Sequence, residues 1–144
     1  MRGYPPRMRA TVSGDVLKEL EALDARAGTQ LEPRLRDMLR LRVSHLNGCA
    51  HSVRLHSESL ALEGVRPDLI SALARPARLI RDGLVSDGEA AALRLAEVLT
   101  DPPRGLEPEV RDSAGEHFNA TQLGAIIQTV ALTNAWNRVL RGTD

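Results

Sequence analysis

The stretch from Asp37 to His56 holds the residues best able to do chemistry, including the only cysteine and three of the four histidines. Cys49, Ser52 and His56 recur at three- and four-residue intervals, so a helix would place them on one face. Asn47-Gly48 predicts a helix break that puts Cys49 in the first turn of the next helix. Free backbone N–H groups there would stabilise a thiolate, and a neighbouring imidazole would exchange its proton. The pattern indicates a redox or nucleophilic site, provided that the sulfur is accessible to solvent.

Other interpretations of these residues remain open. Cys49 could be an inert core residue, and His56 a satisfied interior histidine. His45, Cys49, His51 and His56 match no common zinc spacing, and residues two apart on a helix point in different directions. We therefore predict no metal ion and no cofactor. A Ser52–His56 pair for acyl transfer is disfavoured, because no nucleophile elbow or oxyanion loop accompanies it.

Length and composition favour one globular domain over residues 1–144, with 42% apolar residues and a formal net charge of zero. One Trp, one Tyr and one Phe leave little surface for stacking bases, which argues against nucleic-acid binding. No segment is apolar enough for a secretory signal or a membrane span, so we expect no membrane association. A single cysteine fits a reducing compartment, and we expect a cytoplasmic protein.

Hydrophobic periodicity predicts an all-α domain of about six to seven helices, with no convincing strand. Residues 1–13 form an extended arm because of Pro5 and Pro6, and residues 101–105 form a loop. The expected helices span residues 15–27, 33–46, 49–63, 67–73, 86–99, 108–118 and 121 onward, whereas residues 74–85 are unassigned.

Two features of these helices concern their packing. The first helix should bury Val16, Leu17, Leu20 and Leu23, and the second a stripe of Leu35, Leu39, Val43 and Leu46. The last helix is apolar enough for the core or a subunit interface. A run of arginines predicts a solvated or intersubunit face, with phosphate contact as the alternative: Arg34, Arg36, Arg40 and Arg42.

Two stretches resemble a known family. LRDMLRLRVSHLNGCAHSVRLHSESLALEGV is similar to the active-site helices of AhpD-like alkylhydroperoxidases in the carboxymuconolactone decarboxylase-like superfamily. FNATQLGAIIQTVALTNAWNRVL resembles the last helix of that family. Family members carry a Glu, a C-x-x-C motif beginning twelve residues later, and a His four residues after the second Cys. Cys49 matches the first cysteine, His51 the histidine inside the motif, and His56 the relay histidine. Asp37 replaces the Glu, and Ser52 replaces the second cysteine.

The resemblance implies reduction of hydroperoxides, in which one cysteine is oxidised, the other captures it and a dithiol partner reduces the disulfide. Serine has no sulfenate–disulfide cycle, so this chain would use Cys49 alone with an external thiol or dithiol. Cys49 would be the nucleophile, His56 the proton-relay base and Asp37 its charge-stabilising partner, while Ser52 and His51 tune the thiolate. The family also implies a homo-oligomer, a trimer or hexamer.

Two alternatives keep the fold and change the function. One is a non-redox acid–base enzyme of the carboxymuconolactone decarboxylase kind, acting on a small organic acid through His56 and Asp37, with Cys49 lining the pocket. The other is a degenerate, non-catalytic redox sensor or assembly module.

Overall fold

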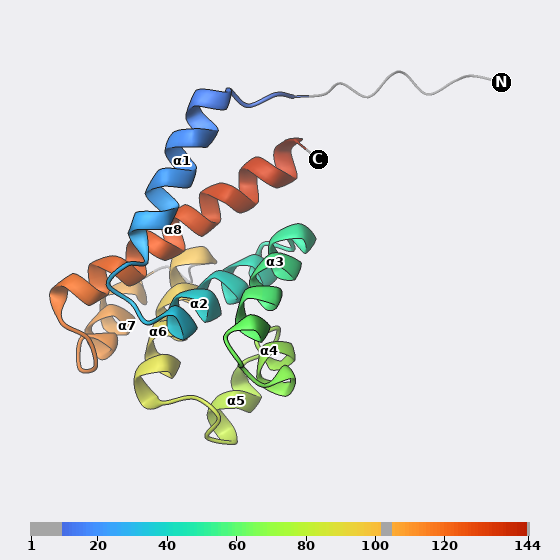
Figure 1. Ribbon diagram of the computed structural model, residues 1–144. Helices are drawn as coiled ribbons and strands as arrows, with labels where there is room; N and C mark the ends of the chain where they lie inside the picture. The colour runs from blue at the N-terminus through green and yellow to red at the C-terminus, as the bar shows by residue number, and fades with distance from the viewer. Residues whose placement is uncertain (1–9, 102–104, 144) are drawn as a thin grey trace.

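A computed structural model describes residues 10–101 and 105–143. Over these ranges the chain is all-α, as predicted, and a short helix, Ala77–Arg81, forms within residues 74–85, for which the sequence predicted no element. Eight helices follow one another (Figure 1): α1 (Gly14–Ala27), α2 (Pro33–Leu46), α3 (Ala50–Leu62), α4 (Pro67–Ala72), α5 (Ala77–Arg81), α6 (Asp87–Thr100), α7 (Glu107–Ala114) and α8 (Ala120–Thr143). Most of the expected arm at 1–13, and residues 102–104 of the expected loop, lie outside the described residues.

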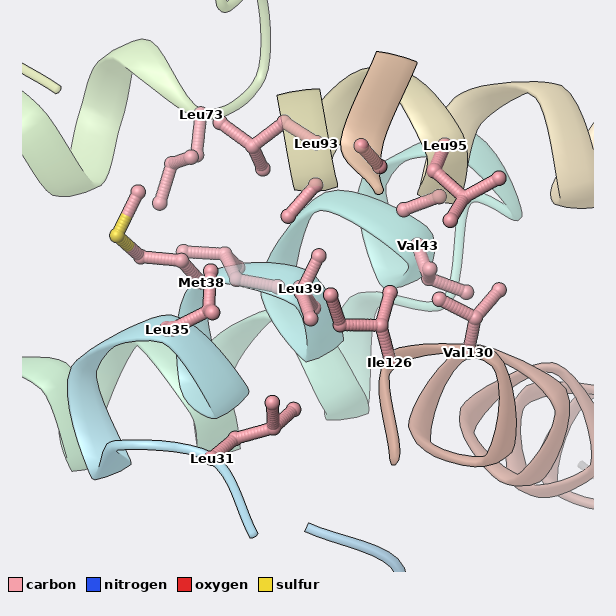
Figure 2. Close-up of a cluster of buried hydrophobic side chains, with 14 of the residues drawn as sticks. Leu31, Leu35, Met38, Leu39, Val43, Leu73, Leu93, Leu95, Ile126 and Val130 are labelled. Atoms are coloured by element: carbon pink, nitrogen blue, oxygen red, sulfur yellow. The ribbon is translucent and has the colours of Figure 1, made fainter. Parts of the chain in front are cut away.

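Helix α2 lies in the middle of the bundle and packs against α3, α6 and α8. Its predicted stripe is largely confirmed, because Leu35, Leu39 and Val43 are buried, while Leu46 is only partly buried. Figure 2 shows the α2 side chains facing apolar residues of α6 and α8. The apolar face of α8 is therefore mainly core, and none of the helices in the described ranges has the length and apolarity to cross a membrane.

Local signals fix where several helices begin. Pro33 occupies the first turn of α2, where its missing N–H costs nothing. Ser86 and Glu89 form the predicted capping box of α6: the Ser86 hydroxyl accepts from the Glu89 N–H at 3.0 Å, and the Glu89 carboxylate accepts from the Ser86 N–H at 2.9 Å. These two contacts fix the position at which α6 begins.

The buried face predicted for α1 is wrong in part. Val16 is 54% exposed and Leu23 46% exposed, and only Ala27 of this helix is fully buried. The reason is that α1 packs along α8 at the margin of the bundle, so one narrow side of it is covered (Figure 1).

The arginine run on α2 is not a solvated face. Arg34 pairs with Glu89 of α6 at 2.8 Å, and Arg42 approaches Glu97 of α6 at 3.5 Å. Arg36 and Arg40 both contact Asp37. The sequence placed these charges correctly on α2 but did not identify the acidic partners, which come largely from other helices.

The fully buried position of Leu39 predicts a large cost of truncation. Leu39→Ala should lower the free energy of unfolding by about 2–5 kcal/mol, because it removes buried methyl groups and leaves a cavity. Leu62→Ala is the matched control, since Leu62 is 90% exposed, and it should change stability by less than about 0.5 kcal/mol. Urea unfolding followed by circular dichroism measures both, and similar values for the two variants would contradict this packing.

Candidate active site

The predicted helix break positions Cys49 between α2 and α3. Gly48 adopts a φ of +62°, a left-handed conformation that favours glycine, and Cys49 is the N-cap residue of α3. The Cys49 N–H donates to the Ser44 carbonyl at 3.0 Å, and the Cys49 carbonyl accepts from the Val53 N–H at 3.0 Å. Cys49 thus lies one position before the first turn in which it was expected, still beside the free N–H groups of α3.

Hydrogen bonds between side chains fix the break against α8. The Asn47 amide donates to Asn134 Oδ1 at 2.9 Å and to Asn137 Oδ1 at 3.0 Å. The fully buried Asn137 amide donates in turn to Ser44 Oγ at 3.2 Å. Because Ser44 also holds the Cys49 N–H, this asparagine network sets the position of the cysteine backbone.

The thiol of Cys49 contacts Ser52 rather than an imidazole. Cys49 Sγ lies 3.3 Å from Ser52 Oγ, and the two residues are each 3% exposed. Among the described residues no hydrogen bond joins Cys49 to His51 or His56. The expectation that Cys49 is accessible to solvent is therefore wrong for the residue as a whole. The predicted proximity of Cys49 and Ser52 is found.

Ser52 and His56 line a partly open cavity of about 260 Å³ between α1, α3 and α8. Its walls also contain His51 and Leu55 of α3, together with Thr133, Trp136 and Leu140 of α8 and Glu21 and Asp24 of α1. Cys49 and Asp37 are not among the lining residues. This cavity brings Ser52, His51 and His56 together and leaves the thiol behind Ser52.

Cys49 lines a separate, more open hollow of about 450 Å³ at the end of α8. Gly48, Ala50 and His51 form one side of the hollow, and Leu140, Arg141 and Thr143 form the other. The Arg141 guanidinium donates to the Asn47 carbonyl, which ties the end of α8 to the helix break. His51 and Leu140 line both spaces, so the hollow and the cavity adjoin.

His56 is neutral at pH 7. Burial is the largest cause that lowers its pKa from 6.5 to about 4, and the charge of Arg40 acts in the same direction. The carboxylate of Asp37 opposes this effect but does not outweigh it. An uncharged imidazole in a cavity wall can accept a proton or a hydrogen bond, although its low pKa makes it a weak base.

Asp37 is 2% exposed and is held by two arginines. Burial alone would raise its pKa; hydrogen bonds from Arg36 and Glu63 and the charges of Arg36 and Arg40 more than compensate, so its pKa is lowered. Arg36 donates to its two oxygens at 3.1 and 3.2 Å, and Arg40 Nη1 lies 3.5 Å from Oδ1. The pKa of Glu63 is raised by loss of solvent and by Asp37. Asp37 therefore affects His56 through its charge, from outside the cavity wall.

Sequence reasoning missed the residues that α1 and α8 contribute to the site. Asp24 and Glu21 carry no motif, and Trp136 was noted only as part of the family's last helix. Arg40 links these layers, because its Nη2 donates to the Asp24 carbonyl at 2.9 Å and lies 3.4 Å from Asp24 Oδ1. In the described part of the chain no three His, Cys, Asp or Glu side chains form a metal-ligating cluster.

Comparison with known proteins identifies the family. Residues 14–99 match the family model of the carboxymuconolactone decarboxylase family. The chain belongs to this family. It is 28% identical over 105 residues to the uncharacterized protein YdfG of Bacillus subtilis (strain 168). The matched residues make up 72% of this chain and 69% of that protein.

Two crystal structures show the same fold as this family member. One is a protein of unknown function from Agrobacterium tumefaciens, suggested to be the antioxidant defence protein AhpD, with a TM-score of 0.82, 24% identity and 91% and 89% of the two chains covered. The other is an uncharacterized peroxidase-related protein from Silicibacter sp. TM1040, with a TM-score of 0.77, 23% identity and coverage of 91% and 69%. The AhpD-like fold expected from the sequence is confirmed.

The half-buried, neutral His56 predicts a loss of stability in mild acid. Between pH 6.5 and about 4, His56 binds a proton in the unfolded chain but not in the folded one. The stability that comes from keeping His56 neutral is therefore fully present above pH 6.5 and is lost as the pH falls. From pH 7 to pH 5 the contribution to the free energy of unfolding should fall by about 2 kcal/mol.

Urea unfolding of wild type and His56→Gln at the two pH values isolates this contribution. The variant should lose about 2 kcal/mol less than wild type over this range. His117→Gln is the control, because His117 is an exposed histidine in the turn after α7 and does not line the cavity. The stability of this variant should change between pH 7 and pH 5 as much as that of wild type. Equal pH dependence in wild type and His56→Gln would show that His56 is not held neutral by burial.

Proposed function

We propose that this protein reduces hydroperoxides in an antioxidant role, with the sulfur of Cys49 as its one redox-active atom. The contact between Cys49 Sγ and Ser52 Oγ at 3.3 Å carries the proposal. It joins a thiol at the start of α3, beside an open hollow, to a hydroxyl in the wall of the His56 cavity. Membership of the family and the fold shared with the two crystal structures agree with this chemistry.

The reaction would begin with removal of the thiol proton. In the resting state the Cys49 S–H donates to Ser52 Oγ, and after ionisation the Ser52 hydroxyl turns to donate to the thiolate. Ser52 lines the same cavity as His56, whose neutral ring accepts the released proton directly or through water. The free N–H groups at the start of α3 stabilise the thiolate charge.

The oxygen transfer then consumes one hydroperoxide and two external thiols. The thiolate attacks the terminal peroxide oxygen, the O–O bond breaks, and the departing alkoxide takes a proton to become an alcohol. Cys49 becomes a sulfenic acid. A first external thiol converts it to a mixed disulfide and water, and a second releases the Cys49 thiol and an external disulfide.

Peroxide consumption with a thiol reductant tests the role of the sulfur. Cys49→Ala should abolish thiol-dependent turnover, while Ser113→Ala, an exposed serine of α7, should retain the wild-type rate. Ser52→Ala should slow turnover about tenfold or more, because a hydrogen bond to a charged group contributes about 1.5–3 kcal/mol. Undiminished turnover in Cys49→Ala would refute the thiol mechanism.

A companion variant, Ser52→Cys, asks whether the missing second thiol limits this chemistry. It restores a C-x-x-C motif at a position already in side-chain contact with Cys49. Turnover should rise, and non-reducing peptide mapping should show a disulfide between positions 49 and 52 after peroxide treatment. If turnover does not rise and no such disulfide forms, Cys49 is not oxidised to a sulfenic acid within reach of position 52.

A second candidate is an acid–base enzyme of the carboxymuconolactone decarboxylase kind. The observation in its favour is that Ser52 and His56 line the cavity whereas Cys49 does not. Under this alternative Cys49→Ala would keep activity towards a lactone acid and His56→Ala would lose it. The same pair of variants assayed on peroxide and on a lactone acid separates the two candidates.

We also propose that copies of the chain associate through α1. Val16 and Leu23 expose apolar side chains on one side of this helix, which no other described residue covers. Native mass spectrometry should show a homo-oligomer, and Leu23→Glu should shift it towards monomer. Leu62→Glu changes an equally apolar and more exposed residue away from α1, and it should leave the assembly intact. Monomeric wild type at all concentrations would exclude this assembly.

A further inference from the structure

The cavity beside His56 has an uneven distribution of charge. Its apolar walls are Leu55, Trp136 and Leu140, while α1 contributes the carboxyl groups of Glu21 and Asp24. Among the described residues that line it there is no lysine or arginine. An apolar space with acidic groups and an aromatic ring is suited to small molecules that carry a positive charge or a hydrogen-bond donor.

We infer that Glu21 and Asp24 make this cavity selective for small apolar molecules bearing an ammonium or hydroxyl group, and against molecules bearing a carboxylate. An ammonium group would meet the two carboxyl groups and the indole ring of Trp136. A carboxylate in the same place would lose its water and be repelled by the carboxylates of Glu21 and Asp24.

Asp24 is only partly neutralised by its neighbours. Arg40 Nη2 approaches Asp24 Oδ1 at 3.4 Å but donates its hydrogen bond to the Asp24 carbonyl at 2.9 Å, and Arg40 is also shared with Asp37. Asp24 Oδ1 is shielded from water and accepts no hydrogen bond from the described residues. Glu21 lies one turn earlier on the same helix and adds a second acidic group at the cavity.

This selectivity goes beyond the proposed peroxide chemistry and does not depend on Cys49, which lies outside the cavity wall. It also bears on the choice between the candidate functions. The lactone acids of the second candidate are anions, and a cavity that disfavours carboxylates would bind them poorly. Uncharged molecules meet no such barrier.

Trp136 provides a direct measure of binding, because it is the only tryptophan of the chain and lines the cavity. Benzylamine, benzyl alcohol and benzoate share one ring and are positive, neutral and negative at pH 7. Titrations followed by tryptophan fluorescence should give affinities that fall in that order. Benzylamine should bind about tenfold or more tightly than benzoate at low salt, and added salt should narrow the difference.

Matched variants assign the selectivity to α1. Glu21→Gln should reduce the ratio of benzylamine to benzoate affinity several-fold, and Asp24→Asn should reduce it too. Glu58→Gln, an exposed residue of α3 outside the cavity wall, should leave the ratio unchanged. Glu21→Gln should fold as wild type does, because Glu21 is exposed and its side chain makes no hydrogen bond with the other described residues.

Three results would overturn the inference: benzoate binding as tightly as benzylamine, an unchanged ratio in both Glu21→Gln and Asp24→Asn, or no fluorescence response to any probe. The same titrations on Cys49→Ala separate this inference from the proposed function. Cys49→Ala should keep the selectivity and lose peroxide turnover. In the wild-type protein, selectivity without peroxide turnover would contradict the thiol mechanism alone. Peroxide turnover without selectivity contradicts the cavity inference alone.

Discussion

The hydrogen bonds among Asn47, Asn137 and Ser44 tie the end of α2 and the start of α3 to α8. Asn137 of α8 accepts from Asn47 and donates to Ser44, whose carbonyl holds the backbone N–H of Cys49. A buried amide that loses its partner costs about 1–3 kcal/mol, so this arrangement strongly favours one geometry for the break. The position of the Cys49 backbone follows from it, because the Cys49 N–H donates to the Ser44 carbonyl.

A second constraint is the charge on α2. Two arginines hold Asp37 in its ionised form at the edge of the site, and Arg40 extends the same network to Asp24 on α1. This network gives the surroundings of His56 both signs of charge, yet burial dominates and keeps the ring neutral. The site therefore combines a weakly basic imidazole with a thiol to which no hydrogen bond joins it among the described residues, an arrangement suited to slow rather than rapid proton transfer.

Local signals in the sequence were sufficient for most of the fold. Pro33, the Ser86–Glu89 capping box and the Asn47-Gly48 break act within a few residues, and each is found where the sequence predicted it. The spacing on α3 likewise brought Cys49 and Ser52 together. These features depend on helix geometry alone, which the sequence records directly.

The features that the sequence did not reveal depend on contacts between distant helices. Periodicity showed that α1 has an apolar side but not that α8 would cover so little of it, which leaves Val16 and Leu23 exposed. The contribution of Asp24 to the cavity follows from the same packing of α1. The burial of Cys49 was also missed, because the end of α8 that faces it lies about ninety residues away in the chain.

The most direct test of the central claim is a single-turnover oxidation followed by peptide mass spectrometry. Wild-type protein treated with one equivalent of cumene hydroperoxide and then dimedone, a trap for sulfenic acids, should carry the dimedone adduct on Cys49 and release one equivalent of cumyl alcohol. Cys49 recovered as an unmodified thiol, with the peroxide unconsumed or its oxygen found only on methionine, would contradict the role assigned to this sulfur.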